Sequence, residues 1–165
     1  MNIILSGFMG SGKSTLAKLL AEKLDMYYLD LDEFIEKKCG MNVTEIFQTK
    51  GEGEFRRLEE EAAKEVGTYD NYVIATGGGT ILNSNNVKSL KANGKIVFLD
   101  VTVDTVIRRL ANDDTRPLLQ TSDKENAVSV MLEGRLPIYQ AAADITFDAN
   151  SDDTNKKVAD LIKKL

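Results

Sequence analysis

Residues 7–14 read GFMGSGKS, directly after the apolar run IIL of residues 3–5 and directly before a helical pattern. Glycines followed by Lys-Ser at this spacing, between a strand and a helix, are typical of a phosphate-binding loop. Backbone N–H groups of such a loop converge on phosphate oxygens, and the helix that follows adds the positive end of its dipole. The plainer alternative, glycines that only shape a strand-to-helix turn, is the weaker one in this context. The stretch therefore predicts a domain that binds a nucleoside triphosphate.

The last two residues of this motif carry its chemistry. Lys13 is expected to reach the outer phosphates of the nucleotide. The Ser14 hydroxyl suits Mg²⁺, a hard ion that prefers oxygen ligands and takes some of them from the nucleotide. The chain has no Asn-Lys-x-Asp element after a strand that would read guanine. The expected ligand is therefore magnesium-bound ATP rather than GTP.

Short β-rich runs alternate with helical patterns along the whole chain, which predicts an α/β domain with a parallel sheet covered by helices on both faces. The strand-like runs are residues 2–6, 27–30, 72–75, 95–100 and 144–148. The helical patterns cover residues 12–24, 31–38, 54–66, 84–93, 103–111, 124–142 and 152–164. We expect one domain over residues 1–165, because no linker or repeat divides it.

Composition limits the possible functions of the chain. Its 165 residues are 42% hydrophobic, which is enough for one packed core, and its apolar stretches are too short to span a bilayer. A net charge of −5 and a sequence pI near 4.9 give no general attraction for nucleic acid or anionic membranes. Cys39 is the only cysteine and no secretory leader precedes the first strand, so we expect a cytoplasmic protein, a monomer by default. Since there is no histidine, the chemistry must come from Asp, Glu, Lys and Arg.

Two carboxylates end the second predicted strand, where parallel sheets collect their ligands. Asp30 and Asp32 alternate across Leu31, so their side chains can point to different partners. Asp30 is expected to hold a magnesium-bound water, and Asp32 to accept a hydrogen bond from the hydroxyl that attacks the γ-phosphate. The alternative for either residue is a cap of the helix that begins near residue 31. The neighbouring phosphate loop favours the functional interpretation.

An arginine and a glutamate share one face of the helix predicted at 54–66. Arg56 and Glu59 are three residues apart, beside the apolar Phe55 and Leu58. Glu59 can orient Arg56 as a fork for a carboxylate or phosphate. The alternative is an ordinary solvated ion pair, and taken alone that alternative is favoured.

Three consecutive glycines, Gly77, Gly78 and Gly79, follow the third predicted strand. Without a Cβ they can offer backbone N–H groups close to a ligand. A simple turn is the competing interpretation, but one or two glycines would suffice for it. Three therefore favour close approach of a substrate.

Two further arginines lie in the last third of the chain. Arg116 is at the centre of a polar segment rich in helix breakers, which we expect to form a lid over residues 112–124 that closes on the transferring phosphate and excludes water. Arg135 precedes the segment LPIY of residues 136–139, so we expect it near an interruption of its helix, as a second anion fork.

With these motifs assembled, the chain resembles the shikimate kinase family, in the nucleoside monophosphate kinase branch of phosphate-loop proteins, over essentially its full length. The motifs that carry the resemblance are GFMGSGKST at residues 7–15, Asp30-x-Asp32, Phe55-Arg56-x-x-Glu59, Gly77-Gly78-Gly79, Arg116-Pro117-Leu118-Leu119 and Arg135-x-Pro137-x-Tyr139. Ile138 stands where the family usually has Leu. The resemblance implies a three-layer phosphate-loop NTPase fold with five parallel strands, a lid and a substrate-binding region near residues 31–66. It also implies transfer of the γ-phosphate of ATP to the 3-hydroxyl of shikimate, on the route to chorismate and aromatic amino acids.

The resemblance assigns roles to particular positions of this chain. Asp32, Lys13 and Arg116 are expected to act in catalysis, with Mg²⁺ held by Ser14 and, through water, by Asp30. The positions expected to bind ATP are Gly10, Ser11, Gly12, Lys13, Ser14, Thr15, Arg109 and Arg116. The positions expected to bind shikimate are Asp32, Arg56, Gly77, Gly78, Gly79 and Arg135. Arg109 is expected to stack on adenine, with residues 150–154 covering its other side.

Two rival functions remain open on the sequence. Another small-molecule kinase of the same branch, such as a gluconate kinase, would share the loop and the lid. A nucleotide-dependent binding or regulatory module would keep the fold without catalysis, although retention of Asp32, Arg116 and both acid-binding arginines disfavours it.

Overall fold

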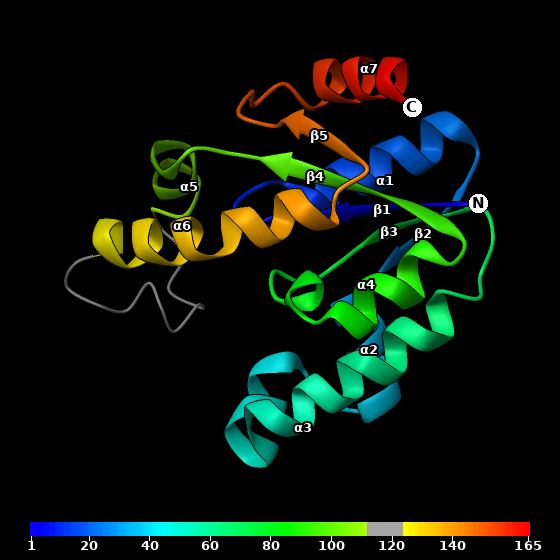
Figure 1. Ribbon diagram of the computed structural model, residues 1–165, viewed down its shortest axis with the longest axis vertical. Coiled ribbons are helices and arrows are strands. Elements are labelled where there is room, and N and C mark those ends of the chain that lie inside the picture. Colours follow the sequence, from blue (N-terminus) through cyan, green and yellow to red (C-terminus); the bar gives the residue numbers. More distant parts are fainter. Residues whose placement is uncertain (112–123) are drawn as a thin grey trace.

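The computed structural model describes residues 1–111 and 124–165 as a sheet of five parallel strands between two layers of helices (Figure 1). The strand order is β2-β3-β1-β4-β5, so the first strand lies at the centre of the sheet. The strands are β1 (Asn2–Ser6), β2 (Tyr27–Asp30), β3 (Tyr72–Ala75), β4 (Gly94–Asp100) and β5 (Ile145–Asp148). The α/β class and the parallel sheet predicted from the sequence are confirmed.

Helices α1 and α7 cover one face of the sheet, whereas α4 and α6 lie against the other (Figure 1). The helices are α1 (Lys13–Leu24), α2 (Leu31–Cys39), α3 (Val43–Val66), α4 (Ser84–Lys91), α5 (Val103–Arg109), α6 (Lys124–Ala142) and α7 (Thr154–Lys164), with a 3-10 turn η1 (Thr80–Leu82). No helix in residues 1–111 and 124–165 is long and apolar enough to cross a membrane.

Burial of the central strands explains why the sequence shows them as apolar runs. Ile4 and Leu5 of β1 and residues 96–99 of β4 are at most 1% exposed, because helices cover both faces of these strands. β2 lies at the edge of the sheet, and its Tyr27 is 64% exposed. All five strands run in one direction, so their carboxyl ends, with the phosphate loop after β1, meet at one edge.

Two local predictions were wrong. Helix α3 begins at Val43, capped by the Asn42 side chain, rather than near residue 54, and it is kinked at Gly51, where φ is +85°. The glycine interrupts the helical pattern, so only the second half of α3 was apparent from the sequence. Arg56 therefore follows the kink rather than starting the helix. Helix α6 continues through Pro137 to Ala142, so Arg135 lies within a continuous helix and not at an interruption.

Candidate active site

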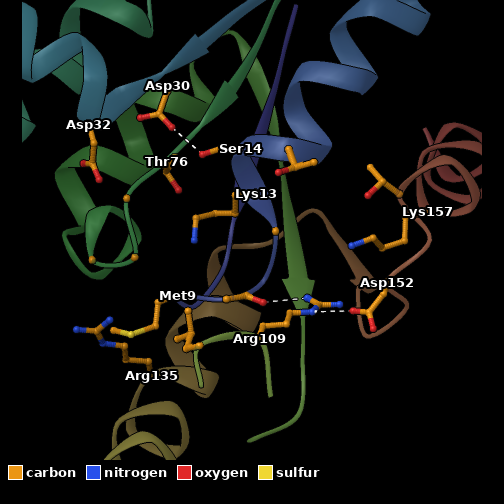
Figure 2. Close-up of a pocket in the computed structure, with 18 of the residues that line it drawn as sticks. Met9, Lys13, Ser14, Asp30, Asp32, Thr76, Arg109, Arg135, Asp152 and Lys157 are labelled. Carbon is orange, nitrogen blue, oxygen red and sulfur yellow. Dashed lines mark hydrogen bonds and ion pairs between the residues drawn. The ribbon is translucent and has the colours of Figure 1, made fainter. Parts of the chain in front are cut away.

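An open cavity of about 640 Å³ lies at the carboxyl edge of the sheet (Figure 2). It brings together segments that are far apart in the sequence: the phosphate loop, the ends of β2 and β3, and residues of α3, α5, α6 and α7. The predicted site residues that line it are Gly10, Gly12, Lys13, Ser14, Thr15, Asp30, Asp32, Arg56, Gly77, Gly78, Gly79, Arg109 and Arg135. Ser11, within the loop itself, is fully buried instead. Arg116, with the predicted lid up to residue 123, lies outside the described residues.

The phosphate loop has the backbone that its glycines allow. Gly10 and Gly12 have φ of +78° and +84°, a conformation that side chains with a Cβ rarely adopt. The Lys13 ammonium donates to the carbonyl oxygens of Gly7 (2.6 Å) and Phe8 (3.1 Å), which holds it over the loop. Gly12 caps α1 without a side chain, so the first turn of α1 presents backbone N–H groups and the positive helix end to a ligand.

A hydroxyl and a carboxylate meet beside this loop. Ser14 Oγ donates to Asp30 Oδ2 at 2.8 Å, while Asp30 Oδ1 accepts from the Glu33 backbone N–H at 3.1 Å and so caps α2. The capping and functional interpretations of Asp30 are therefore compatible, because each uses a different oxygen. Both Ser14 and Asp30 offer hard oxygen ligands that fit Mg²⁺. In the described parts of the chain there is no group of three or more His, Cys, Asp or Glu side chains that could hold a metal ion.

Asp32 is poised as a hydrogen-bond acceptor. Its Oδ1 atom is buried and has no hydrogen-bond partner within residues 1–111 and 124–165. Burial, followed by the negative charges of Asp30 and Glu59, raises the pKa of Asp32 to about 6, although the positive charge of Lys13 opposes the rise. A carboxylate with such a pKa is ionised at neutral pH and is a stronger base than an exposed aspartate.

Arg56 is held by a buried relay rather than by a solvated ion pair. Its Nη1 atom lies 2.9 Å from Oε1 of Glu59, which is only 1% exposed. The other Glu59 oxygen accepts from the Thr80 hydroxyl at 2.9 Å, and Thr80 Oγ1 in turn accepts from the Gly77 N–H at 3.0 Å. Helix α3 is thereby tied to the glycine turn after β3. The sequence showed the Arg56–Glu59 pair but gave no signal for Thr80.

Arg135 reaches the cavity from α6, which is tied to the same turn. The Tyr139 hydroxyl donates to the Gly78 carbonyl oxygen at 2.6 Å, and the Tyr139 ring is fully buried against Phe98. The Arg135 guanidinium lies over the Phe8 ring, 5.7 Å from its centre. This contact between a cation and an aromatic face helps to orient the arginine.

The three glycines make room for three functional side chains. A Cβ at Gly77 would lie 2.9 Å from Asp32 Oδ1, and a Cβ at Gly79 would lie 2.7 Å from both terminal nitrogens of Arg56. At Gly78 the nearest atom is Nη1 of Arg135, at 3.6 Å. One carboxylate and two guanidinium groups therefore lie beside the same turn.

Arg109 joins the phosphate loop to the segment after β5. Its guanidinium donates to the Gly10 carbonyl oxygen at 2.9 Å and pairs with Asp152 at 3.2 Å (Figure 2). It also donates to the carbonyl oxygens of Ala149, Asn150 and Ser151 at 2.8–3.1 Å. Most of its N–H donors are thus used by the protein, and what it can offer a ligand is the flat face of the guanidinium. The stacking on adenine remains a prediction.

A phosphate loop at the switch point of a parallel sheet, with a carboxylate and two arginines on the wall of the same cavity, is typical of a phosphate-loop kinase of a small acidic molecule. The family model described as Shikimate kinase matches residues 9–165 of the chain. The chain belongs to the shikimate kinase family and is an ATP-dependent phosphotransferase.

Individual relatives agree over nearly the whole length. The chain is 44% identical to the shikimate kinase of Caldicellulosiruptor bescii, over 92% of this chain and 86% of that protein. It is 42% identical to the shikimate kinase of Sulfurihydrogenibium sp., over 99% and 97% of the two chains. Among solved structures, the shikimate kinase of Acinetobacter baumannii in complex with shikimate superposes with a TM-score of 0.93 at 35% identity, over 99% of this chain and 91% of that one.

Proposed function

We propose that the protein transfers the γ-phosphoryl group of ATP to the 3-hydroxyl of shikimate, giving shikimate 3-phosphate and ADP on the route to chorismate and aromatic amino acids. The observation that carries this proposal is the Asp32 carboxylate on the wall of a cavity shared by the phosphate loop and two arginines, because its buried Oδ1 atom has no hydrogen-bond partner in the described chain. A related protein of the same fold was solved in complex with shikimate.

The ATP end of the cavity is built to bind phosphates. The loop N–H groups and the N-terminus of α1 take the phosphates, and Lys13 neutralises charge at the γ-phosphate. Ser14 and, through water, Asp30 would hold Mg²⁺ in this proposal. When bound, the metal supplies positive charge to the phosphate oxygens. Arg109 stacks on adenine, and Arg116 adds charge at the transferring group.

The acid end of the cavity is built to hold a carboxylate and to orient a hydroxyl. Arg56 and Arg135 bind the shikimate carboxylate, and the N–H groups of Gly78 and Gly79 bind the ring hydroxyls, whereas the Gly77 N–H is already used by Thr80. Asp32 accepts a hydrogen bond from the 3-hydroxyl and takes its proton as the phosphorus–oxygen bond forms. Phosphoryl transfer needs mainly positioning and charge stabilisation, so a carboxylate suffices without histidine.

An assay of ADP release with Mg-ATP tests the proposal directly. Shikimate, quinate, gluconate and nucleoside monophosphates serve as acceptors. Release with shikimate alone is the expected result. Release with gluconate would instead identify the rival kinase, and release with none of the acceptors would favour a binding or regulatory module.

The same proposal includes a monomer that acts in the cytoplasm, without nucleic-acid or membrane partners. The net charge of −5 and the lone Cys39 support it. Size-exclusion chromatography with light scattering tests the monomer, for which we expect a mass near 18.2 kDa.

A further inference from the structure

A second lysine reaches the phosphate loop, from the other end of the chain. Lys157 lies in the first turns of α7, and the residue is only 6% exposed. Its ammonium lines the active-site cavity, where a Cβ at Gly12 would lie 3.5 Å from Nζ. Figure 2 shows the Lys13 and Lys157 side chains on opposite sides of the start of α1.

The Lys157 ammonium has no ion-pair partner among residues 1–111 and 124–165. The negative charge of Asp152 acts on it, but that carboxylate is engaged by Arg108 and Arg109. Burial and then the positive charge of Arg109 lower the pKa of Lys157. A buried cation without an anion is unfavourable, so a ligand that supplies negative charge would satisfy it.

The position of Lys157 specifies which part of a nucleotide it can contact. Lys13 is held over the carbonyl groups of Gly7 and Phe8, at the side of the loop that faces the acid end of the cavity. Lys157 lies at the opposite side, beside Gly12 and the segment tied down by Arg109, where the nucleoside is expected. The first phosphate from the nucleoside is the α-phosphate.

We propose that the Lys157 ammonium binds the α-phosphate of the nucleotide, as a second cation of the phosphate loop. Lys13 then serves the transferring end and Lys157 the fixed end of the phosphate chain. Because the α-phosphate keeps its charge throughout transfer, Lys157 strengthens nucleotide binding without changing the chemical step. It is therefore a binding residue for ATP and ADP, not a catalytic one.

This inference rests on nucleotide binding at the loop. A matched pair of variants distinguishes failure of the Lys157 contact from failure of the proposed function. Lys156 precedes Lys157 on α7 but is exposed and absent from the cavity wall. Wild type and Lys156→Met should bind MgADP equally in calorimetric titrations. Failure of both to bind would sink the proposed function itself. If both bind, Lys157→Met should bind about tenfold to a hundredfold more weakly, as for loss of one charged hydrogen bond.

A second measurement distinguishes a phosphate contact from distortion of the loop. AMP and adenosine compete against a bound fluorescent ADP analogue, and in Lys157→Met the affinity for AMP should fall while that for adenosine stays unchanged. The KM for ATP should rise, with kcat and the KM for shikimate preserved. Binding of MgADP within twofold of Lys156→Met, or equal losses for AMP and adenosine, would overturn the proposal. If Lys157→Met unfolds more readily than wild type, Lys157→Gln is judged by the same criteria.

Discussion

Replacement of Asp32 by Asn should stabilise the ligand-free protein while it abolishes most turnover. The pKa of Asp32 is raised from its ordinary value of 3.8 to about 6, mainly by burial. The ionised carboxylate therefore costs folding free energy, and a rise of this size corresponds to about 3 kcal/mol at pH 8. The negative charge at the first turn of α2 returns roughly 0.3–1 kcal/mol through the helix dipole. The expected net gain for Asp32→Asn is about 2 kcal/mol.

The pH dependence identifies the origin of that gain. A carboxyl group whose folded pKa is raised contributes its full stability below the unfolded pKa, and loses it as the pH rises through the folded pKa. The excess stability of Asp32→Asn should be largest above pH 7 and fall to about half near pH 5. Urea unfolding of the ligand-free protein at pH 8.0 and pH 5.0 measures both values.

Glu33→Gln is the matched control for this measurement. Glu33 lies in the same first turn of α2 but is exposed, so its neutralisation removes the dipole contribution without relieving burial. The control should show no gain at either pH. The reasoning is refuted if Asp32→Asn is less stable than wild type at pH 8.0, or if its gain is the same at both pH values. Asp32→Asn should still bind MgADP by calorimetry, because the residue is not needed for the nucleotide.

Three further results are expected. In steady-state assays, kcat/KM for shikimate should be constant above pH 7 and fall below about pH 6, because protonation of Asp32 removes the base. A profile that stays flat down to pH 5 would contradict that role. Arg135→Ala should raise the KM for shikimate tenfold or more, with the KM for ATP unchanged, since a charged hydrogen bond is worth roughly 1.5–3 kcal/mol; an unchanged dissociation constant for shikimate argues against the assignment. Gly79→Ala places a methyl group 2.7 Å from the Arg56 guanidinium, so the affinity for shikimate should fall while the urea midpoint stays near that of wild type. Wild-type affinity for shikimate would show that the position of Arg56 beside Gly79 is not needed for binding.

The sequence predicted those parts of the site whose functional groups lie within one short stretch of the chain. The phosphate loop was predicted because backbone N–H groups can converge only where glycines permit it, and Asp32 was predicted because it follows a strand whose carboxyl end lies at the same edge of the sheet as that loop. The sheet was predicted because buried parallel strands are continuous apolar runs. The first half of α3 was missed because Gly51 interrupts its periodicity.

Contacts between distant elements could not be predicted in this way. In the sequence Thr80 is an ordinary turn residue. Only the fold brings its hydroxyl to Glu59, which is 21 residues away along the chain. Tyr139 and Gly78, 61 residues apart, gave no sign of their hydrogen bond. The sequence does not distinguish Lys157 from the other lysines of its predicted helix. Only the packing of α7 beside α1 brings it to Gly12.

We expect the glycine turn after β3 to set the selectivity of the site as well as its shape. It places Arg56 and Arg135 together, and Glu59 neutralises only the first of them within the described chain. We expect an acceptor with a carboxylate to supply the missing negative charge, whereas a neutral polyol would leave the Arg135 guanidinium facing an occupied cavity without an anion. Sites built to bind a polar group discriminate strongly against analogues that lack it, because their own groups are then left unpaired. We therefore expect selection for an acid to follow from the same contacts that would position the hydroxyl against Asp32.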